Sequence, residues 1–85
     1  MKLEITQQAL DDLKRIKKGN KDKALEIMFK IEHVLQKSPF IGKKLKGRYN
    51  HQRSYRIGNH RIIYTLTSTT LTIKRIDHRK DVYKK

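Results

Sequence analysis

The chain has 85 residues, enough for one small domain (residues 1–85), and its 22 Lys and Arg against 8 Asp and Glu give a formal charge of +14. The absence of cysteine excludes disulfides and thiolate metal sites and fits a reducing, cytoplasmic setting. No apolar run approaches the roughly 20 residues that span a bilayer, and charged residues interrupt any N-terminal signal core, so we expect no membrane partner.

Positive charge is the dominant compositional feature, with a sequence pI near 10.3. Such a charge favours polyanions and speeds their capture. A disordered basic tail or a membrane-surface peptide would show the same bias, but here the positive charge is spread over segments with clear apolar periodicity. The composition therefore predicts a folded basic domain that binds nucleic acid, and an acidic protein partner is compatible with it.

The N-terminal half predicts a short strand followed by a helical hairpin. Residues 2–5 alternate between polar and apolar side chains, which is the period of a strand. Thr6 is a suitable N-cap for a first helix that ends at Gly19. Asn20 is a suitable cap for a second helix, which must end before Pro39. So short a connection predicts that the two helices run antiparallel.

The C-terminal half predicts a basic loop and three strands. Residues 42–48 are lysine-rich and contain two glycines, which is typical of a loop. Gly58-Asn59 is a favourable two-residue hairpin turn between the first two of the strands. The strand candidates cover about 52–57, 60–67 and 70–76. The order β-α-α-β-β-β predicts an α+β fold, with the helical hairpin packed on one face of a mainly antiparallel, four-stranded sheet.

Two arginines flank the predicted hairpin turn. Arg56 precedes the turn and Arg61 follows it, so both guanidinium groups can project from one end of the sheet. Alternation along the second strand sends Arg61 to the face opposite Ile62 and Tyr64. Guanidinium groups match phosphate oxygens in a bidentate geometry that ammonium groups cannot provide. The alternative is that both side chains are solvated and inert.

Reactive side chains also follow the last strand. His78, Arg79 and Tyr83 place an imidazole, a guanidinium and a phenol within six residues. Nearby positive charge favours the phenolate, so a phenol or imidazole here is a candidate proton acceptor, and an arginine can stabilise a pentavalent phosphorane. These groups suit RNA cleavage by attack of the 2′-hydroxyl on its neighbouring phosphate, with no metal or cofactor. Alternatively, Tyr83 is a hydrophobic side chain that fixes the tail to the sheet.

In combination, these segments resemble the RelE/ParE toxin superfamily of type II toxin–antitoxin systems. The resemblance rests on the element order, the Leu45-Lys46-Gly47 loop, the hairpin at 55–64 and the terminal segment at 78–83, and it covers essentially the whole chain. His60 replaces the tyrosine that is more usual in the hairpin. The resemblance implies the RelE-like microbial ribonuclease type of fold.

The resemblance implies one of two activities. RelE-like members are mRNA interferases that cut the message in the ribosomal A site, whereas ParE-like members poison DNA gyrase; the RelE-like branch is favoured here. It implies Tyr83 as the general base, with His78 as a rival, Arg61 as the phosphate stabiliser and Arg79 as stabiliser or acid. Arg56 keeps the charge of one of the two lysines found in the best-studied members.

One departure concerns Ser54, which stands where those members carry the other lysine. Arg53 and the lysines of the basic loop would replace its charge if the loop folds over the site. The candidate RNA-binding residues are Lys43, Lys44, Lys46, Arg48 and Arg53. His33 is expected on the surface, and His51 precedes the RNA-facing strand. The histidines show no metal-site spacing, so no metal is expected.

The resemblance also implies partners. A toxin of this kind requires a cognate antitoxin, which should present an acidic or amphipathic segment. Its RNA partners would be mRNA in the ribosomal A site and ribosomal RNA, and operator DNA would be bound only through the antitoxin complex. A basic RNA-binding protein without toxicity is the third interpretation.

Overall fold

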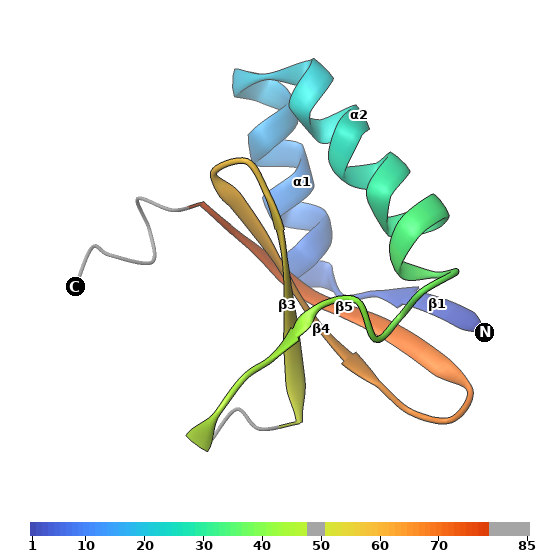
Figure 1. The fold of residues 1–85 in the computed structure, drawn as a ribbon. Helices are drawn as coiled ribbons and strands as arrows, with labels where there is room; N and C mark the ends of the chain where they lie inside the picture. Colours follow the sequence, from blue (N-terminus) through green and yellow to red (C-terminus); the bar gives the residue numbers. More distant parts are fainter. Residues whose placement is uncertain (48–50, 79–85) are drawn as a thin grey trace.

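Two helices cover one face of a five-stranded sheet in the computed structural model, which describes residues 1–47 and 51–78 (Figure 1). The strand order is β1-β5-β4-β3-β2. Strand β1 runs parallel to β5, and the other neighbouring strands of this sheet are antiparallel, which confirms the predicted α+β class. In chain order the elements are β1 (Lys2–Ile5), α1 (Gln7–Gly19), α2 (Lys21–Lys30), η1 (Ile31–Leu35), β2 (Lys43–Lys44), β3 (Gln52–Ile57), β4 (His60–Leu66) and β5 (Thr70–His78).

The sheet has one strand more than the four that were expected. Residues 42–48 were predicted as a loop, but Lys43 pairs with Ser54 and Lys44 with Arg53, so β2 forms an edge strand. Two adjacent lysines carry no period-two pattern of hydrophobicity, so only their pairing with β3 marks them as a strand. A short, lysine-bearing edge strand also discourages the addition of a further strand.

Both helices begin at the predicted caps. The Thr6 hydroxyl accepts a backbone N–H of α1 at 3.1 Å, and the Asn20 side chain accepts a backbone N–H of α2 at 3.0 Å. Because Asn20 alone separates them, α1 and α2 form the predicted hairpin (Figure 1). The second helix continues through the π-helical turn η1, where the Gln36 N–H donates to the Ile31 carbonyl. None of the described helices has the length and apolarity needed to cross a lipid bilayer.

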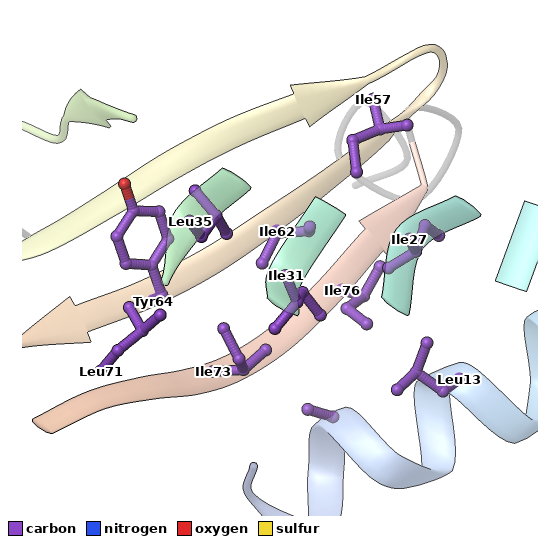
Figure 2. Close-up of a cluster of buried hydrophobic side chains, with 11 residues drawn as sticks. Leu13, Ile27, Ile31, Leu35, Ile57, Ile62, Tyr64, Leu71, Ile73 and Ile76 are labelled. Carbon is purple, nitrogen blue, oxygen red and sulfur yellow. The ribbon is translucent and has the colours of Figure 1, made fainter. Parts of the chain in front are cut away.

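The hydrophobic core lies between the helices and the sheet face they cover (Figure 2). Ile62 and Tyr64 of β4 belong to this cluster, whereas Ile63, although also buried, does not, which confirms the predicted alternation of that strand. The core cluster comprises Ala9, Leu13, Ile27, Ile31, Leu35, Ile57, Ile62, Tyr64, Leu71, Ile73 and Ile76. The helices leave the other face of the sheet uncovered (Figure 1).

A buried carboxylate joins α1 to the sheet. The side chain of Asp12 is only 3% exposed. One oxygen accepts the Ile76 backbone N–H of β5 at 2.9 Å. The other accepts hydrogen bonds from Gln8 at 2.9 Å and Arg15 at 3.1 Å. Because both oxygens have donors, the burial of this charge is tolerated.

We expect Asp12→Ala to lower the free energy of unfolding by about 2 kcal/mol, because it leaves the buried Ile76 N–H without its acceptor. Urea denaturation followed by circular dichroism measures this loss. Asp11→Ala is the matched control, since Asp11 is exposed and accepts a hydrogen bond from Gln7 of its own helix. Equal losses for the two variants would contradict the assigned role of Asp12.

Candidate nucleic-acid interface

The uncovered face of the sheet gathers cationic side chains around the β3–β4 hairpin. Directly opposite residues of antiparallel strands project to the same face, so the register identifies its members. Arg56 lies opposite Arg61, and Arg61 lies opposite Asp77 of β5. The adjoining row of directly opposite residues runs across the sheet from Lys43 of β2, through Ser54 and Ile63, to Arg75 of β5. We call the two rows together the basic face; its members are Lys43, Ser54, Arg56, Arg61, Ile63, Arg75 and Asp77.

A β-bulge determines which residues of β5 reach the basic face. Ile63 pairs with Arg75 but Tyr64 pairs with Ile73, so Lys74 is an extra residue opposite this step. Beyond the bulge, the side chains of β5 that would have pointed to one face of the sheet point to the other face. Arg75 and Asp77 therefore project to the uncovered face, although strict alternation from the buried Ile73 would direct them toward the helices.

The charges of the basic face favour an anion at Arg56 and Arg61. Arg75 Nε donates to both oxygens of Asp77, at 3.0 and 3.2 Å, and so neutralises this carboxylate. Arg56 Nε donates to the Gly58 carbonyl in the turn at 3.1 Å. Within the described residues, no carboxylate forms an ion pair with Arg56 or Arg61. Like charges directly opposite repel each other, and a phosphate bound between the two guanidinium groups would relieve that repulsion.

The structure also places a cation beside Ser54. Lys43 lies directly opposite Ser54 on the edge strand and therefore shares its face. A lysine from β2 thus stands next to the position where the sequence of β3 lacks one. This is the arrangement expected if the basic segment at 42–48 supplies the missing charge.

We expect Lys43→Ala to weaken the binding of a short single-stranded RNA and to reduce the slope of log affinity against log salt by about 0.7, the value for one lost phosphate contact. Fluorescence anisotropy at several salt concentrations measures both quantities. Lys18→Ala is the charge-matched control, because Lys18 lies on α1, away from the basic face. If both variants changed the slope equally, Lys43 would contribute only to the general charge of the protein.

His78 lies on the opposite face from the arginines of the hairpin. It pairs with His60, and the two rings meet edge-on with centroids 4.8 Å apart. Both rings, together with Arg15, line a pocket of about 390 Å³ beside the C-terminal end of α1. The structure therefore does not bring His78 together with Arg61.

Arg53 and Lys44 also lie on the side of the sheet that faces the helices. Arg53 pairs with Tyr64 of the core, and Lys44 pairs with Arg53. The Arg53 guanidinium donates to the carbonyls of Gly42 at 2.9 Å and Phe40 at 3.4 Å. It also lies 5.0 Å from the centroid of the Phe40 ring. Arg53 thus holds the loop before β2 and does not line the basic face.

The other predicted residues are less informative. Lys46 is exposed beyond β2, and His33 is exposed on η1 with its ring 4.5 Å from that of Phe29. Among residues 1–47 and 51–78, no group of three or more His, Asp or Glu could hold a metal ion. Three predicted site residues lie outside the described residues: Arg48, Arg79 and Tyr83.

Sequence reasoning missed the buried hydroxyl of Tyr64. This group donates to the Pro39 carbonyl at 2.8 Å and accepts the Gly42 N–H at 2.9 Å. Burial raises the pKa of the Tyr64 phenol above its ordinary value of 10.0, so the phenol stays protonated and can donate. The pKa of the exposed Glu26 is lowered instead, mainly by a hydrogen bond from Lys23. The signal for Tyr64 was a tyrosine among the inward-facing aliphatic residues of β4, because a buried phenol requires a polar partner.

Comparison with known proteins decides the family. A family profile described as "ParE toxin of type II toxin-antitoxin system, parDE" matches residues 3–83. The chain belongs to this toxin family. The match places it within the RelE/ParE toxin superfamily, as the sequence resemblance predicted. No curated protein sequence matches the toxin significantly.

Solved toxins share the fold. A chain of the toxin–antitoxin complex RelBE2 from Mycobacterium tuberculosis superposes with a TM-score of 0.83 at 26% identity, over 92% of this chain and 96% of that chain. The YoeB/ParE toxin from Agrobacterium tumefaciens has a TM-score of 0.78 at 24% identity, over 92% and 98%. The chromosomal ParDE toxin–antitoxin system from P. aeruginosa gives 0.67 at 23% identity, over 92% and 95%. At these identities, the last two matches show the fold alone.

Proposed function

We propose that this toxin is a ribosome-dependent mRNA interferase, a metal-independent endoribonuclease that a cognate antitoxin neutralises. The observation that carries the proposal is the pair Arg56 and Arg61, which lie opposite each other on an uncovered sheet face. Bidentate guanidinium groups suit the phosphate of a single strand laid across the sheet. Complexes such as RelBE2 and YoeB-YefM, both described as toxin–antitoxin pairs, support the antitoxin partner.

In the proposed reaction, the 2′-hydroxyl of one nucleotide attacks the adjacent phosphorus. A new P–O bond forms, the bond to the 5′-oxygen breaks, and the products are a 2′,3′-cyclic phosphate and a 5′-hydroxyl. Arg56 and Arg61 stabilise the charge that develops on the non-bridging oxygens. Tyr83 takes the proton of the 2′-hydroxyl. Arg79 stabilises the departing 5′-oxygen, which gains its proton from Arg79 or from water to become the 5′-hydroxyl; both roles come from the sequence resemblance. Tyr83 is preferred to His78 because His78 belongs to the other face.

A gyrase-poisoning toxin is the second candidate. The ParE family profile favours it, and so does the serine at position 54. If the protein has this second function, the basic face binds gyrase or its DNA and catalyses no reaction.

Two assays with the purified toxin separate the candidates. Primer extension on mRNA from a translating extract should show cuts at codon positions with 5′-hydroxyl ends. A supercoiling assay with purified gyrase should show no stabilised cleavage complexes. Intact message together with trapped gyrase–DNA complexes would overturn the proposal in favour of the second candidate.

A further inference from the structure

The ion pair between Arg75 and Asp77 engages only one of the N–H donors of the arginine. Arg75 Nε donates to both carboxylate oxygens, at 3.0 and 3.2 Å. A guanidinium group has about five N–H donors, so those on its two terminal nitrogens take no part in this pair. The Arg75 side chain is 38% exposed and that of Asp77 is 24% exposed. The pair therefore presents a guanidinium group that is anchored at Nε and partly accessible from solvent.

Arg75 lies on the same face of the sheet as Arg61 and close to it. Arg61 is directly opposite Asp77. Arg75 is opposite Ile63, two residues further along β4. Arg61 and Arg75 are therefore diagonal neighbours, and such positions lie about 7–8 Å apart, within reach of long side chains. Since Arg56 lies on the other side of Arg61, three guanidinium groups can converge on one phosphate held at Arg61.

The carboxylate of Asp77 distinguishes between two kinds of ligand for Arg75. It cancels one positive charge on the basic face, so it weakens the attraction of any partner recruited by net charge, an acidic protein segment included. A reacting phosphate gains from the pair instead, because its oxygens must meet donors in a fixed position. An arginine that is already oriented also loses little rotamer freedom on binding. The pair therefore favours the reacting phosphate of an RNA over an acidic segment.

We propose that Arg75 is a third arginine that binds the reacting phosphate, beside Arg56 and Arg61, and that Asp77 is the positioning residue that orients it. The terminal nitrogens of Arg75 donate to a non-bridging oxygen as charge develops there, while Nε stays with Asp77. Asp77 itself contacts no substrate and takes no proton. These roles rest on the proposed function, and they belong to two residues that the sequence patterns did not single out.

The first test follows mRNA cleavage on ribosomes programmed with a defined message, at toxin concentrations from limiting to saturating. Arg75→Ala should reduce the rate at saturating toxin at least about tenfold. Arg75→Lys keeps the charge but has a single ammonium group, so it should keep the half-saturating concentration of the wild type and not its saturating rate. Arg15→Ala is the matched control and should cut like the wild type, because Arg15 also pairs with a carboxylate, 3.1 Å from Asp12, but lies on α1.

Asp77→Ala separates positioning from charge. Because it removes a negative charge, it should bind a fluorescein-labelled, 2′-O-methyl single-stranded RNA, which cannot undergo 2′-hydroxyl attack, at least as tightly as the wild type does. Its saturating cleavage rate should nevertheless fall at least about fivefold, because Arg75 is no longer held in position. In the Arg75→Ala background, Asp77→Ala should cause no further loss. Asp11→Ala is the charge-matched control on α1 and should leave the saturating rate unchanged.

Three outcomes would contradict these roles while the wild type still cuts mRNA. One is a wild-type saturating rate for Arg75→Ala protein that thermal melting shows to be folded. Another is an equal loss on Asp77→Ala with and without Arg75, which would exclude an action of Asp77 through the arginine. The third is that Arg75→Ala weakens only the complex with a co-expressed antitoxin, which would make the pair a protein contact. Failure of the proposed function is a separate result: the wild type itself would then leave mRNA uncut, and the roles of Arg75 and Asp77 would fall with it.

Discussion

Arg61→Ala is expected to reduce mRNA cleavage at least about 100-fold, which is the usual loss when one donor to a developing oxyanion is removed. Arg61 lies at the centre of the basic face, with Arg56 opposite it on one side and Asp77 on the other. Because Arg75 already engages that carboxylate, Asp77 competes only weakly for the Arg61 guanidinium. Quantitative primer extension over a time course measures the loss.

Two variants sharpen this prediction. Arg61→Lys should recover only a small part of the activity, since an ammonium group cannot bind two phosphate oxygens in the guanidinium geometry. Lys18→Ala is the control, because Lys18 is a cation on α1 away from the basic face, and it should lose much less activity. Thermal melting confirms that each variant is folded. Wild-type cleavage by a folded Arg61→Ala protein would exclude the basic face as the catalytic site.

Gly42→Ala is expected to lower the free energy of unfolding by about 3 kcal/mol, through overpacking and the loss of buried hydrogen bonds. A Cβ atom at position 42 would clash with the Tyr64 hydroxyl and would lie 2.8 Å from Cε1 and 2.9 Å from Cζ of the ring. Tyr64 is fully buried and cannot move aside without disturbing the core. Urea denaturation gives the loss, and Gly19→Ala, where nothing lies within 4 Å, should not destabilise the protein.

The pair Gly42 and Tyr64 can be tested further by a double-mutant cycle. Tyr64→Phe alone should destabilise the protein, because it leaves the Pro39 carbonyl and the Gly42 N–H without their partner. In the Tyr64→Phe background, the added methyl group of Gly42→Ala no longer meets the hydroxyl. The combined loss should therefore be smaller than the sum of the single losses. Additive losses would show that the two positions do not interact.

Most of the fold was predictable because its signals are local. The caps at Thr6 and Asn20 and the turn at Gly58-Asn59 depend on residues within a few positions of each other, and the structure confirms both caps and the turn. The opposition of Arg56 and Arg61 follows from the same turn, since a two-residue loop determines the register of its hairpin. The pairing of these two arginines could therefore be predicted from the sequence.

The rest of the site depends on contacts between distant segments. The bulge at Lys74 sends Arg75 to the basic face and leaves His78 with His60, although no pattern around residue 74 marks an extra residue. Lys43 joins the basic face only because β2 pairs with β3. These positions follow from how strands pair and shift across the sheet, which is a property of the packed structure.

The sequence by itself thus determined the helical hairpin, the core-facing residues of β4 and the paired arginines, because short-range backbone preferences and hydrophobic periodicity suffice for them. Only the tertiary structure decided which face receives Arg75 and His78, how Lys43 stands beside Ser54, and how Tyr64 and Arg53 hold the loop that exposes Phe40. The physical reason is that each of these contacts joins residues far apart in the chain, whose geometry is established only when the sheet and its core assemble.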